Sequence, residues 1–269
     1  MKFVQRDLGE AAEASSGGGG KGMTREILTL SGAMLALLIV VYFGIGFLVE
    51  WTLPWVSVER EQRWFGGMYA NDDMGIVVEE NGGRLEDARR VLDKLLAVEE
   101  APPISFQLIL LEDSDPNAFA IPGGRIAITT GLLEVIEDNE IALAFVLGHE
   151  LGHFMQRDHL RGLGRSIGRG LIWALIFGGS GGIDLISERT NQLLDLGHSR
   201  EQESGADREG FLLVMQSYGT AEGSERLFEW LAEQSNQPRW LSVLESHPPP
   251  ADRVEKLRGW AMEFESRNE

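Results

Sequence analysis

The stretch that decides the fold is residues 149–153, His-Glu-Leu-Gly-His, which follows the apolar run IALAFVLG at 141–148. Residues four positions apart lie on one face of an α-helix, about one turn from each other. A helix is therefore predicted here, beginning near Asp138 or Asn139, either of which can cap it, and running through Phe154. Its apolar first half predicts that the helix is deeply buried.

Two imidazoles at this spacing can bind one metal ion, with Zn–N distances of about 2.0–2.1 Å. Glu150 follows the first histidine, so it can reach a metal-bound water without binding the ion. Its carboxylate can then take the proton of that water, whose pKa zinc lowers to about 7. The alternative is a pair of histidines satisfied by hydrogen bonds. Burying these polar groups without a metal would be costly, which favours a zinc site with His149 and His153 as ligands.

A catalytic zinc ion usually has three protein ligands and one open position. One candidate for the third ligand is His159, which stands where the longer HExxHxxGxxH pattern has its third histidine. Gln156 replaces the glycine at which that pattern turns the chain. On an uninterrupted helix His159 would lie about 80° around from His149 and about 120° from His153, so it would point away.

The other candidate is Glu203, within the run SREQESGAD at residues 199–207. On a helix Glu203 shares a face with Asp207, which could accept the spare N–H of a ligating histidine. The small residues 204–206 would let this helix lie close to the first. An acidic run taken alone is usually a solvated helix face, so spacing leaves both candidates open.

The order of these motifs resembles a family of membrane-associated zinc metallopeptidases of the gluzincin type. HExxH followed by SRxxExxAD is similar to HtpX, the type 1 CAAX prenyl proteases and the BepA-like proteases. The segments NAFAIPGG at 117–124 and ITTGLL at 128–133 resemble the strand region before the metal helix of that family. Ser246-His247-Pro248, with Arg253 after it, resembles its C-terminal His-Pro motif. The resemblance covers about residues 105–260.

The resemblance implies that Glu203 is the third zinc ligand and that Asp207 supports a ligating histidine. It implies that His247 lies near the metal, where it either stabilises the tetrahedral intermediate or fills the open position at rest. Without the resemblance, His247 is an ordinary loop histidine before prolines. The family's edge strand, to which an extended peptide substrate adds by backbone pairing, would here contain Asn117, Ala118 and Phe119.

The N-terminal part of the chain predicts a membrane anchor. Residues 1–26 are polar and glycine-rich, which predicts a flexible tail. Residues 27–49 form an uncharged, mostly apolar run that would cover about 30–35 Å as a helix, enough to cross a bilayer. Trp51 and Trp55 suit the membrane interface. A signal peptide is the alternative, but the run is long for one and no cleavage site follows promptly.

The orientation of this anchor follows from the basic residues around it. Four of them precede the helix and two follow it closely: Lys2, Arg6, Lys21 and Arg25, then Arg60 and Arg63. This excess favours an N-terminus inside the cell and the bulk of the chain outside. In a bacterium the domain would be periplasmic, on the inner membrane.

Composition excludes several classes of function. The formal net charge is −18, from 24 basic and 42 acidic side chains, so the surface repels phosphate backbones and nucleic-acid binding is not expected. The chain has no cysteine. Disulfides, thiolate metal sites and cysteine nucleophiles are therefore excluded.

The rest of the chain predicts a mainly helical α+β fold with a small sheet. After the anchor, residues 50–103 form a helical linker or first part of the domain, and residues 104–269 form the zinc peptidase domain. Residues 170–183 are uncharged but short for a span, which predicts a buried or membrane-grazing segment. The remaining predicted elements are a helix at 85–96, strands at 104–111 and 125–130, and helices from Ser199 and over 250–264.

These expectations lead to one function and two alternatives. The function is a zinc-dependent endopeptidase, with one Zn²⁺ per chain, that hydrolyses misfolded, membrane or envelope proteins. The first alternative is a membrane-tethered zinc-binding chaperone or adaptor whose site is closed by a fourth ligand. The second is a membrane scaffold without a metal.

Overall fold

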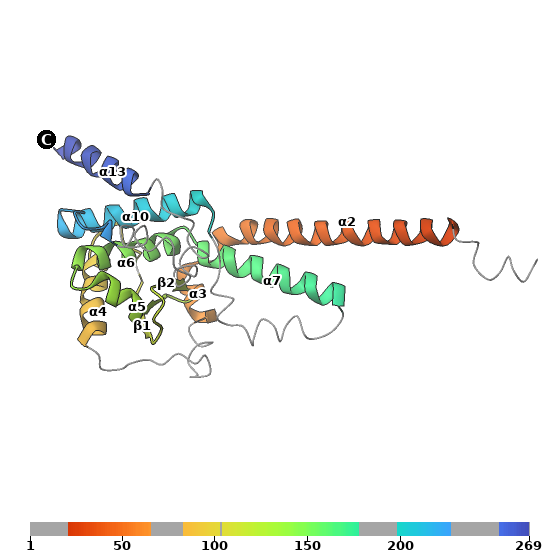
Figure 1. The fold of residues 1–269 in the computed structure, drawn as a ribbon, viewed down its shortest axis with the longest axis horizontal. Helices are drawn as coiled ribbons and strands as arrows, with labels where there is room; N and C mark the ends of the chain where they lie inside the picture. Colours follow the sequence, from red (N-terminus) through yellow and green to blue (C-terminus); the bar gives the residue numbers. More distant parts are fainter. Residues whose placement is uncertain (1–20, 66–82, 103, 178–197, 227–252, 269) are drawn as a thin grey trace, which may run out of the picture.

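The computed structural model describes residues 21–65, 83–102, 104–177, 198–226 and 253–268. Helix α2, Lys21–Thr52, is the longest described helix, and its N-terminal part projects well beyond the rest of the described chain (Figure 1). A short 3-10 helix, η1 (Leu53–Trp55), and helix α3 (Val58–Phe65) lead from it toward the domain. His247 and residues 1–20 of the predicted tail lie outside the described residues.

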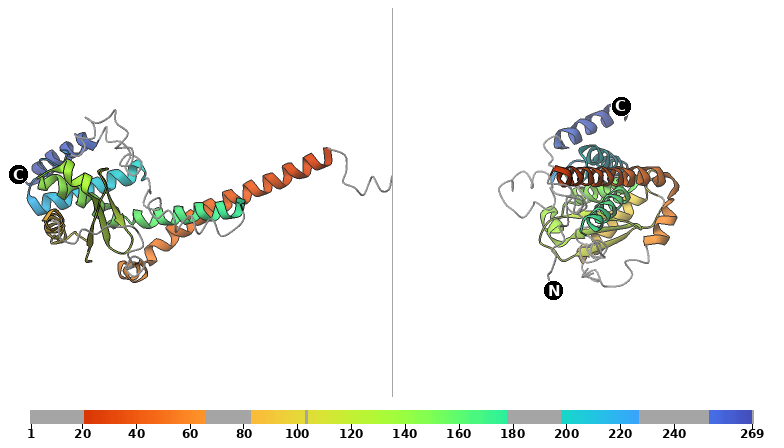
Figure 2. Two further views of the ribbon diagram at one scale, coloured as in Figure 1. Left: turned by 60° about the horizontal axis from the view of Figure 1, so that its bottom comes forward. Right: turned by 90° about the vertical axis from the view of Figure 1, so that its right-hand side faces the viewer.

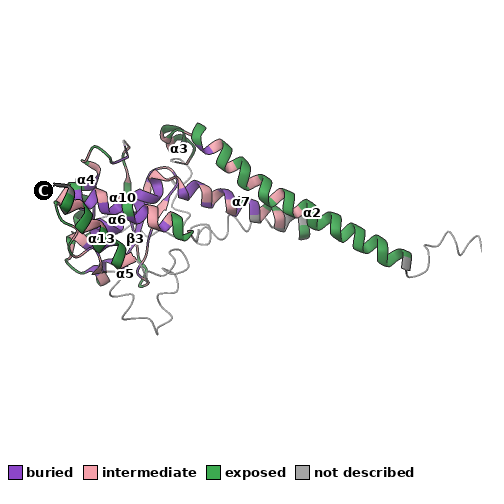
Figure 3. Ribbon diagram, turned by 90° about the horizontal axis from the view of Figure 1, so that it is seen from above, coloured by how far each residue is buried: buried purple, intermediate pink, exposed green. Residues whose placement is uncertain are grey.

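Helix α2 confirms the predicted helix over 27–49 and extends it at both ends, so the last residues of the predicted tail, 21–26, are helical. It is the one helix in the described part of the chain that is long and apolar enough to cross a membrane. Most of its side chains are exposed along its whole length (Figure 3). The rings of Trp51 and Trp55 lie at its C-terminal end, 6.0 Å apart between centroids.

Residues 170–177 continue a longer helix than the sequence predicts. Helix α7, Asp158–Phe177, begins inside the domain and then runs beside α2 (Figures 1 and 2). The first eight residues of the stretch 170–183, predicted as buried or membrane-grazing, therefore belong to α7, and residues 178–183 lie outside the described part. Glycines lower helix propensity here, but packing against α2 compensates.

The sheet has three strands in the order β1-β3-β2. Strand β1 (Gln107–Leu111) pairs parallel with β3 (Arg125–Thr129), and Gln107 lies opposite Arg125. Strand β2 (Ala118–Ile121) pairs antiparallel with the other edge of β3. The predicted strands are confirmed, although β1 starts three residues later than expected.

The remaining helices enclose the core against the sheet. Helix α6, Glu140–Met155, is capped by Asn139, whose side chain accepts from the backbone N–H of Ala142 at 3.0 Å. Helix α10, Arg200–Tyr218, starts with a capping box between Ser199 and Gln202. Three further helices complete the described fold: α4 (Gly83–Leu96), α5 (Thr130–Ile136) and α13 (Arg253–Asn268).

Helices α6 and α10 are in backbone contact. A Cβ added at Gly152 would lie 2.7 Å from the carbonyl oxygen of Ala206, closer than side chains tolerate. One added at Gly210 would lie 2.7 Å from the amide nitrogen of His149. The predicted close approach of the two helices is thus confirmed, with glycines on both helices. It brings the side chains of the two motifs together.

Candidate metal centre

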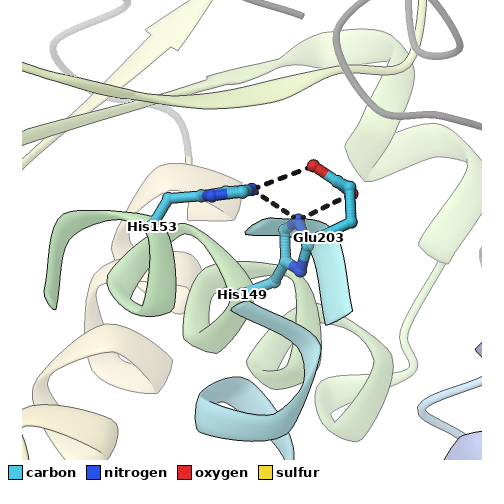
Figure 4. A group of neighbouring side chains, drawn as sticks. All are labelled: His149, His153 and Glu203. Atoms are coloured by element: carbon cyan, nitrogen blue, oxygen red, sulfur yellow. Dashed lines mark hydrogen bonds and ion pairs between the residues drawn. The ribbon is translucent and has the colours of Figure 1, made fainter. Parts of the chain in front are cut away.

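Three side chains from α6 and α10 converge in the interior of the domain (Figure 4). The Nε2 atoms of His149 and His153 are 3.1 Å apart. Glu203 places Oε1 3.2 Å from Nε2 of His153 and Oε2 3.6 Å from Nε2 of His149. The fold therefore brings the two histidines of the HExxH motif and Glu203 of the acidic run into one cluster, as the sequence predicted.

This geometry fits a zinc ion. Ligand atoms at about 2.0–2.1 Å from a tetrahedral ion are about 3.3 Å from one another. The three measured separations of 3.1, 3.2 and 3.6 Å lie around that value. Two imidazole nitrogens and one carboxylate also match the donor set of many catalytic zinc sites. The residues present are therefore suited to hold a metal ion with one position left open.

Each of the two histidines is oriented by a carboxylate of its own, in addition to its contact with Glu203. Nδ1 of His149 lies 2.9 Å from Oδ1 of Asp207, and Nδ1 of His153 lies 3.0 Å from Oδ2 of Asp158. A carboxylate at Nδ1 holds the proton there and leaves the lone pair of Nε2 for a metal. Asp207 fits the supporting role that the resemblance implied.

The electrostatics of the two imidazoles differ. Burial, together with the neighbouring His153, lowers the pKa of His149 to about 4. Burial also opposes protonation of His153, but hydrogen bonds to Asp158 and Glu203 raise its pKa to about 9. Simultaneous protonation of both imidazoles is therefore disfavoured.

Arg253, the first residue of α13, joins this cluster. Its Nε donates to Oδ2 of Asp207 at 2.7 Å, and its Nη2 also contacts Oδ1 of that carboxylate. Its Nη1 lies 3.1 Å from Oε2 of Glu203. The guanidinium of Arg253 therefore holds Glu203, the candidate third ligand, in a fixed position relative to Asp207, which contacts His149. The sequence marked this residue as part of a motif but gave it no role.

Glu150 lies next to His149 on α6 and is 2% exposed. Its negative charge contributes to the raised pKa of His153, so the carboxylate is within electrostatic range of the cluster. It does not belong to the group of converging donor atoms. This arrangement is compatible with the predicted role of a base beside the ion rather than a ligand.

His159 lies in another cluster. Its Nε2 is 2.8 Å from Oε1 of Glu61, and its ring stacks on Phe154 with centroids 4.6 Å apart. The helix does not continue to His159 as the angular argument assumed, because the chain takes a positive φ of 64° at Arg157 and turns without a glycine. His159 is nevertheless absent from the donor groups found among the described residues.

The sequence pattern of peptidase family M48 matches residues 84–261, more than half of the chain. The chain belongs to peptidase family M48. This match covers both motifs that supply the cluster, and it confirms the resemblance to membrane-associated zinc metallopeptidases.

Several relatives share this M48 region. The chain is 26% identical over 227 residues to the protein named Mitochondrial metalloendopeptidase OMA1 of Schizosaccharomyces pombe, covering 80% of this chain and 65% of the relative. It is 31% identical over 163 residues to Metalloprotease YcaL of Escherichia coli, covering 58% and 61%. It is 30% identical over 220 residues to the Protease HtpX homolog of Acidiphilium cryptum, covering 66% and 75%. The chain spans less than two thirds of the first two relatives.

The predicted substrate strand of this M48 chain is an edge strand. Ala118 and Phe119 pair with Ile128 and Ala127 of β3, and no strand among the described residues pairs with the outer edge of β2. Asn117 precedes β2, and its carbonyl accepts from the backbone N–H of Thr129 at 3.0 Å. Strand β2 packs against α6, the helix of the metal ligands.

Nothing in the sequence pointed to Asp158 at this M48 site, whereas His198, just before Ser199, was a possible surplus ligand with no role assigned to it. Asp158 follows the HExxH motif by five residues, and the turn at Arg157 brings it back to His153. His198 stacks on His153 with centroids 3.9 Å apart, and it could form a second donor group with His153 and Asp158. Asp158 already accepts from Gln202 and Arg161, so its structural role is the better supported one.

Proposed function

We propose that this M48 chain is a zinc-dependent endopeptidase that holds one Zn²⁺ through His149, His153 and Glu203. The observation that supports this most strongly is the convergence of two Nε2 atoms and one carboxylate, all within 4.8 Å, beside the buried Glu150. Bound zinc would polarise the scissile carbonyl and acidify a water molecule at the site.

The chain's own residues then divide the remaining work. Glu150 takes the proton of the attacking water and delivers it to the leaving amine, as a general base and then a general acid. Asp207 and Asp158 keep the Nδ1 protons of the two histidines in place, so that both Nε2 atoms face the same point. Arg253 holds Glu203 and Asp207 by charged hydrogen bonds.

The proposed substrate is a protein segment in extended form. It would add to the outer edge of β2 at Asn117, Ala118 and Phe119 by backbone hydrogen bonds, a common mode of peptide recognition. The packing of β2 on α6 supports this choice, because it would keep the peptide near the metal ligands. The proposed role of His247 is the one that the resemblance implies. It would lie near the open position of the metal, where it either stabilises the tetrahedral intermediate or occupies that position in the resting state.

We further propose a single-pass protein whose domain lies on the outer face of the membrane, periplasmic in a bacterium. The excess of basic residues before α2 supports this orientation. Misfolded membrane or envelope proteins are then the proposed substrates, because an edge strand accepts unfolded segments with little regard to sequence.

Cleavage of casein by the purified full-length protein tests the proposal. We expect hydrolysis that stops on treatment with a chelator and returns when Zn²⁺ is added back. Elemental analysis would show about one zinc per chain, as expected for a single three-ligand site. Stoichiometric zinc without any cleavage would instead support the closed chaperone or adaptor. Absence of zinc from gently purified protein would refute both.

A further inference from the structure

Helix α7 packs on the membrane anchor through two glycines. A Cβ added at Gly164 would lie 2.4 Å from Cγ2 of Val49, and one added at Gly168 would lie 3.3 Å from Cγ2 of Ile45. The residue numbers rise along α7 while they fall along α2, so the two helices run antiparallel. Glycines four residues apart allow the close helix contacts that are common inside membranes.

The contact continues down the anchor. Four residues of α2 are partly covered while their neighbours are exposed, and they recur at helical spacing: Leu38, Val41, Ile45 and Val49. Residues three or four apart form one stripe of a helix. This stripe ends at Leu38, in the middle of the apolar run 27–49, so α7 accompanies α2 for about half of its apolar length.

A charged pair lies where the apolar run of α2 ends. Nε of Arg161 lies 2.8 Å from Oε1 of Glu50, the residue that directly follows the apolar run of α2. Beyond this pair α7 carries two more arginines, and after Arg169 the residues 170–183 are uncharged. Arginines near the interface are tolerated because long basic side chains extend to the headgroups.

Apolar side chains of α7 are exposed on both flanks of its contact with α2. Ile167, Leu171 and Ile176 are each about half exposed, although the domain has a well-packed core elsewhere. A soluble helix would present polar residues on such a face. If α2 crosses a bilayer, the C-terminal half of α7 lies beside it and must be in the same hydrocarbon.

We infer that the C-terminal half of α7, Gly168–Phe177, enters the lipid bilayer beside α2 as a second, partly inserted helix. From the level of Gly164, Phe177 lies about 20 Å further along the axis, past the middle of a hydrocarbon core of about 30 Å. In the other direction Asp158, the partner of His153, lies only about 9 Å from that level. The metal centre is therefore held close to the lipid headgroups.

Depth-dependent fluorescence quenching tests this inference without any use of peptidase activity. The chain has no cysteine, so single substitutions Leu171→Cys and Ile176→Cys can each carry one environment-sensitive fluorophore. Ile39→Cys in α2 serves as the inserted control, and Glu134→Cys on the exposed face of α5 serves as the aqueous control. The labelled full-length proteins are placed in phosphatidylcholine liposomes that contain lipids with a nitroxide at a shallow or a deep acyl position.

We expect quenching at Leu171 and Ile176 that is comparable to Ile39 and several-fold stronger than at Glu134. Ile176 should respond more to the deep nitroxide than Leu171 does, because it lies about 7–8 Å further along the helix. Quenching at both positions as weak as at Glu134 would overturn the inference.

A disulfide tests the helix pair in the membrane independently. A Cβ at Gly168 would lie 3.7 Å from Cβ of Ile45, which is the ordinary Cβ–Cβ separation of a disulfide. The variant Ile45→Cys/Gly168→Cys should therefore form a disulfide in liposomes. Neither cysteine should then react with maleimide. The matched pair Phe43→Cys/Gly168→Cys should keep them, because Phe43 is exposed on another face. Free thiols in the first pair would also overturn the inference.

Discussion

Asp158 Oδ2 lies 3.0 Å from Nδ1 of His153, and Asp158 is also the first residue of the helix that runs along the membrane anchor. Asp158, which orients the candidate zinc ligand His153, therefore belongs to α7, the helix that packs against α2. We expect Asp158→Asn to lower zinc affinity about 10–100-fold, the usual effect of removing such a partner. Competition with a fluorescent chelator measures this. Asp93→Asn, on the exposed face of α4, is the control and should leave the affinity unchanged.

Glu150→Gln separates catalysis from metal binding. The amide cannot accept a proton from water, so cleavage of casein should fall by at least about 100-fold. Zinc content should stay at the wild-type level, because Glu150 is not among the converging donors. Glu134→Gln makes the same chemical change at an exposed position and should cleave normally. Wild-type turnover by Glu150→Gln would rule out its role as the base.

The two candidates for the third ligand make opposite predictions. Glu203→Ala removes a carboxylate that lies 3.2 Å from His153, so zinc affinity should fall by more than about 100-fold. His159→Ala removes a side chain that is paired with Glu61, so it should lower stability and leave zinc stoichiometric. Isothermal titration with Zn²⁺ on both purified variants decides between them. The reverse pattern would assign the ion to His159.

Backbone contact between α6 and α10 predicts a strong effect of one methyl group. Gly152→Ala places a Cβ 2.7 Å from the carbonyl oxygen of Ala206, and we expect a loss of about 1–3 kcal/mol in the free energy of unfolding. Gly259→Ala in α13 meets no atom within 4 Å and should be neutral or stabilising by up to about 1 kcal/mol. Urea titrations measure both. Equal stability of the two variants would argue against the close helix contact.

The buried pair of Glu61 and His159 predicts a dependence of stability on pH. Burial opposes the charge of Glu61, but hydrogen bonds from His159 and the backbone N–H of Gly123 lower the pKa of its carboxyl below 4.5. Its contribution is therefore present above pH 4.5 and is lost as the pH falls through the lowered value. Glu61→Gln should be less stable than wild type by about 1–3 kcal/mol at neutral pH, and the difference should shrink in acid. A difference that is constant with pH would contradict this account.

The metal cluster was the most predictable part of the molecule. The fixed spacing of His149 and His153 on one helix, and of Glu203 and Asp207 on another, determines local geometry from sequence alone. That the two helices meet could be anticipated from the small residues after Glu203. The motif order, known from relatives of the family, then selected Glu203 over His159.

The parts that were missed depend on contacts between distant segments. Glu61 lies 98 residues before His159, and nothing in the local sequence of either predicts their pairing. The turn at Arg157 needs a positive φ that its residue type disfavours, so it could not be anticipated. The full length of α7 was hidden by its glycines, which weaken a helix in isolation but allow contact with α2.

The contact of α6 with α10 at Gly148, Gly152, Ala206 and Gly210 also affects which metal ion the site can bind. Nitrogen and carboxylate donors by themselves bind copper(II) more tightly than zinc, following the usual stability series. Copper(II), however, prefers ligands in a square plane, and two helices in main-chain contact restrict how far their side chains can spread into that layout. Calcium, which binds six to eight oxygen ligands, is poorly matched to two imidazole nitrogens and one carboxylate. The close contact of the two helices therefore favours a tetrahedral zinc ion over a square-planar copper(II) ion.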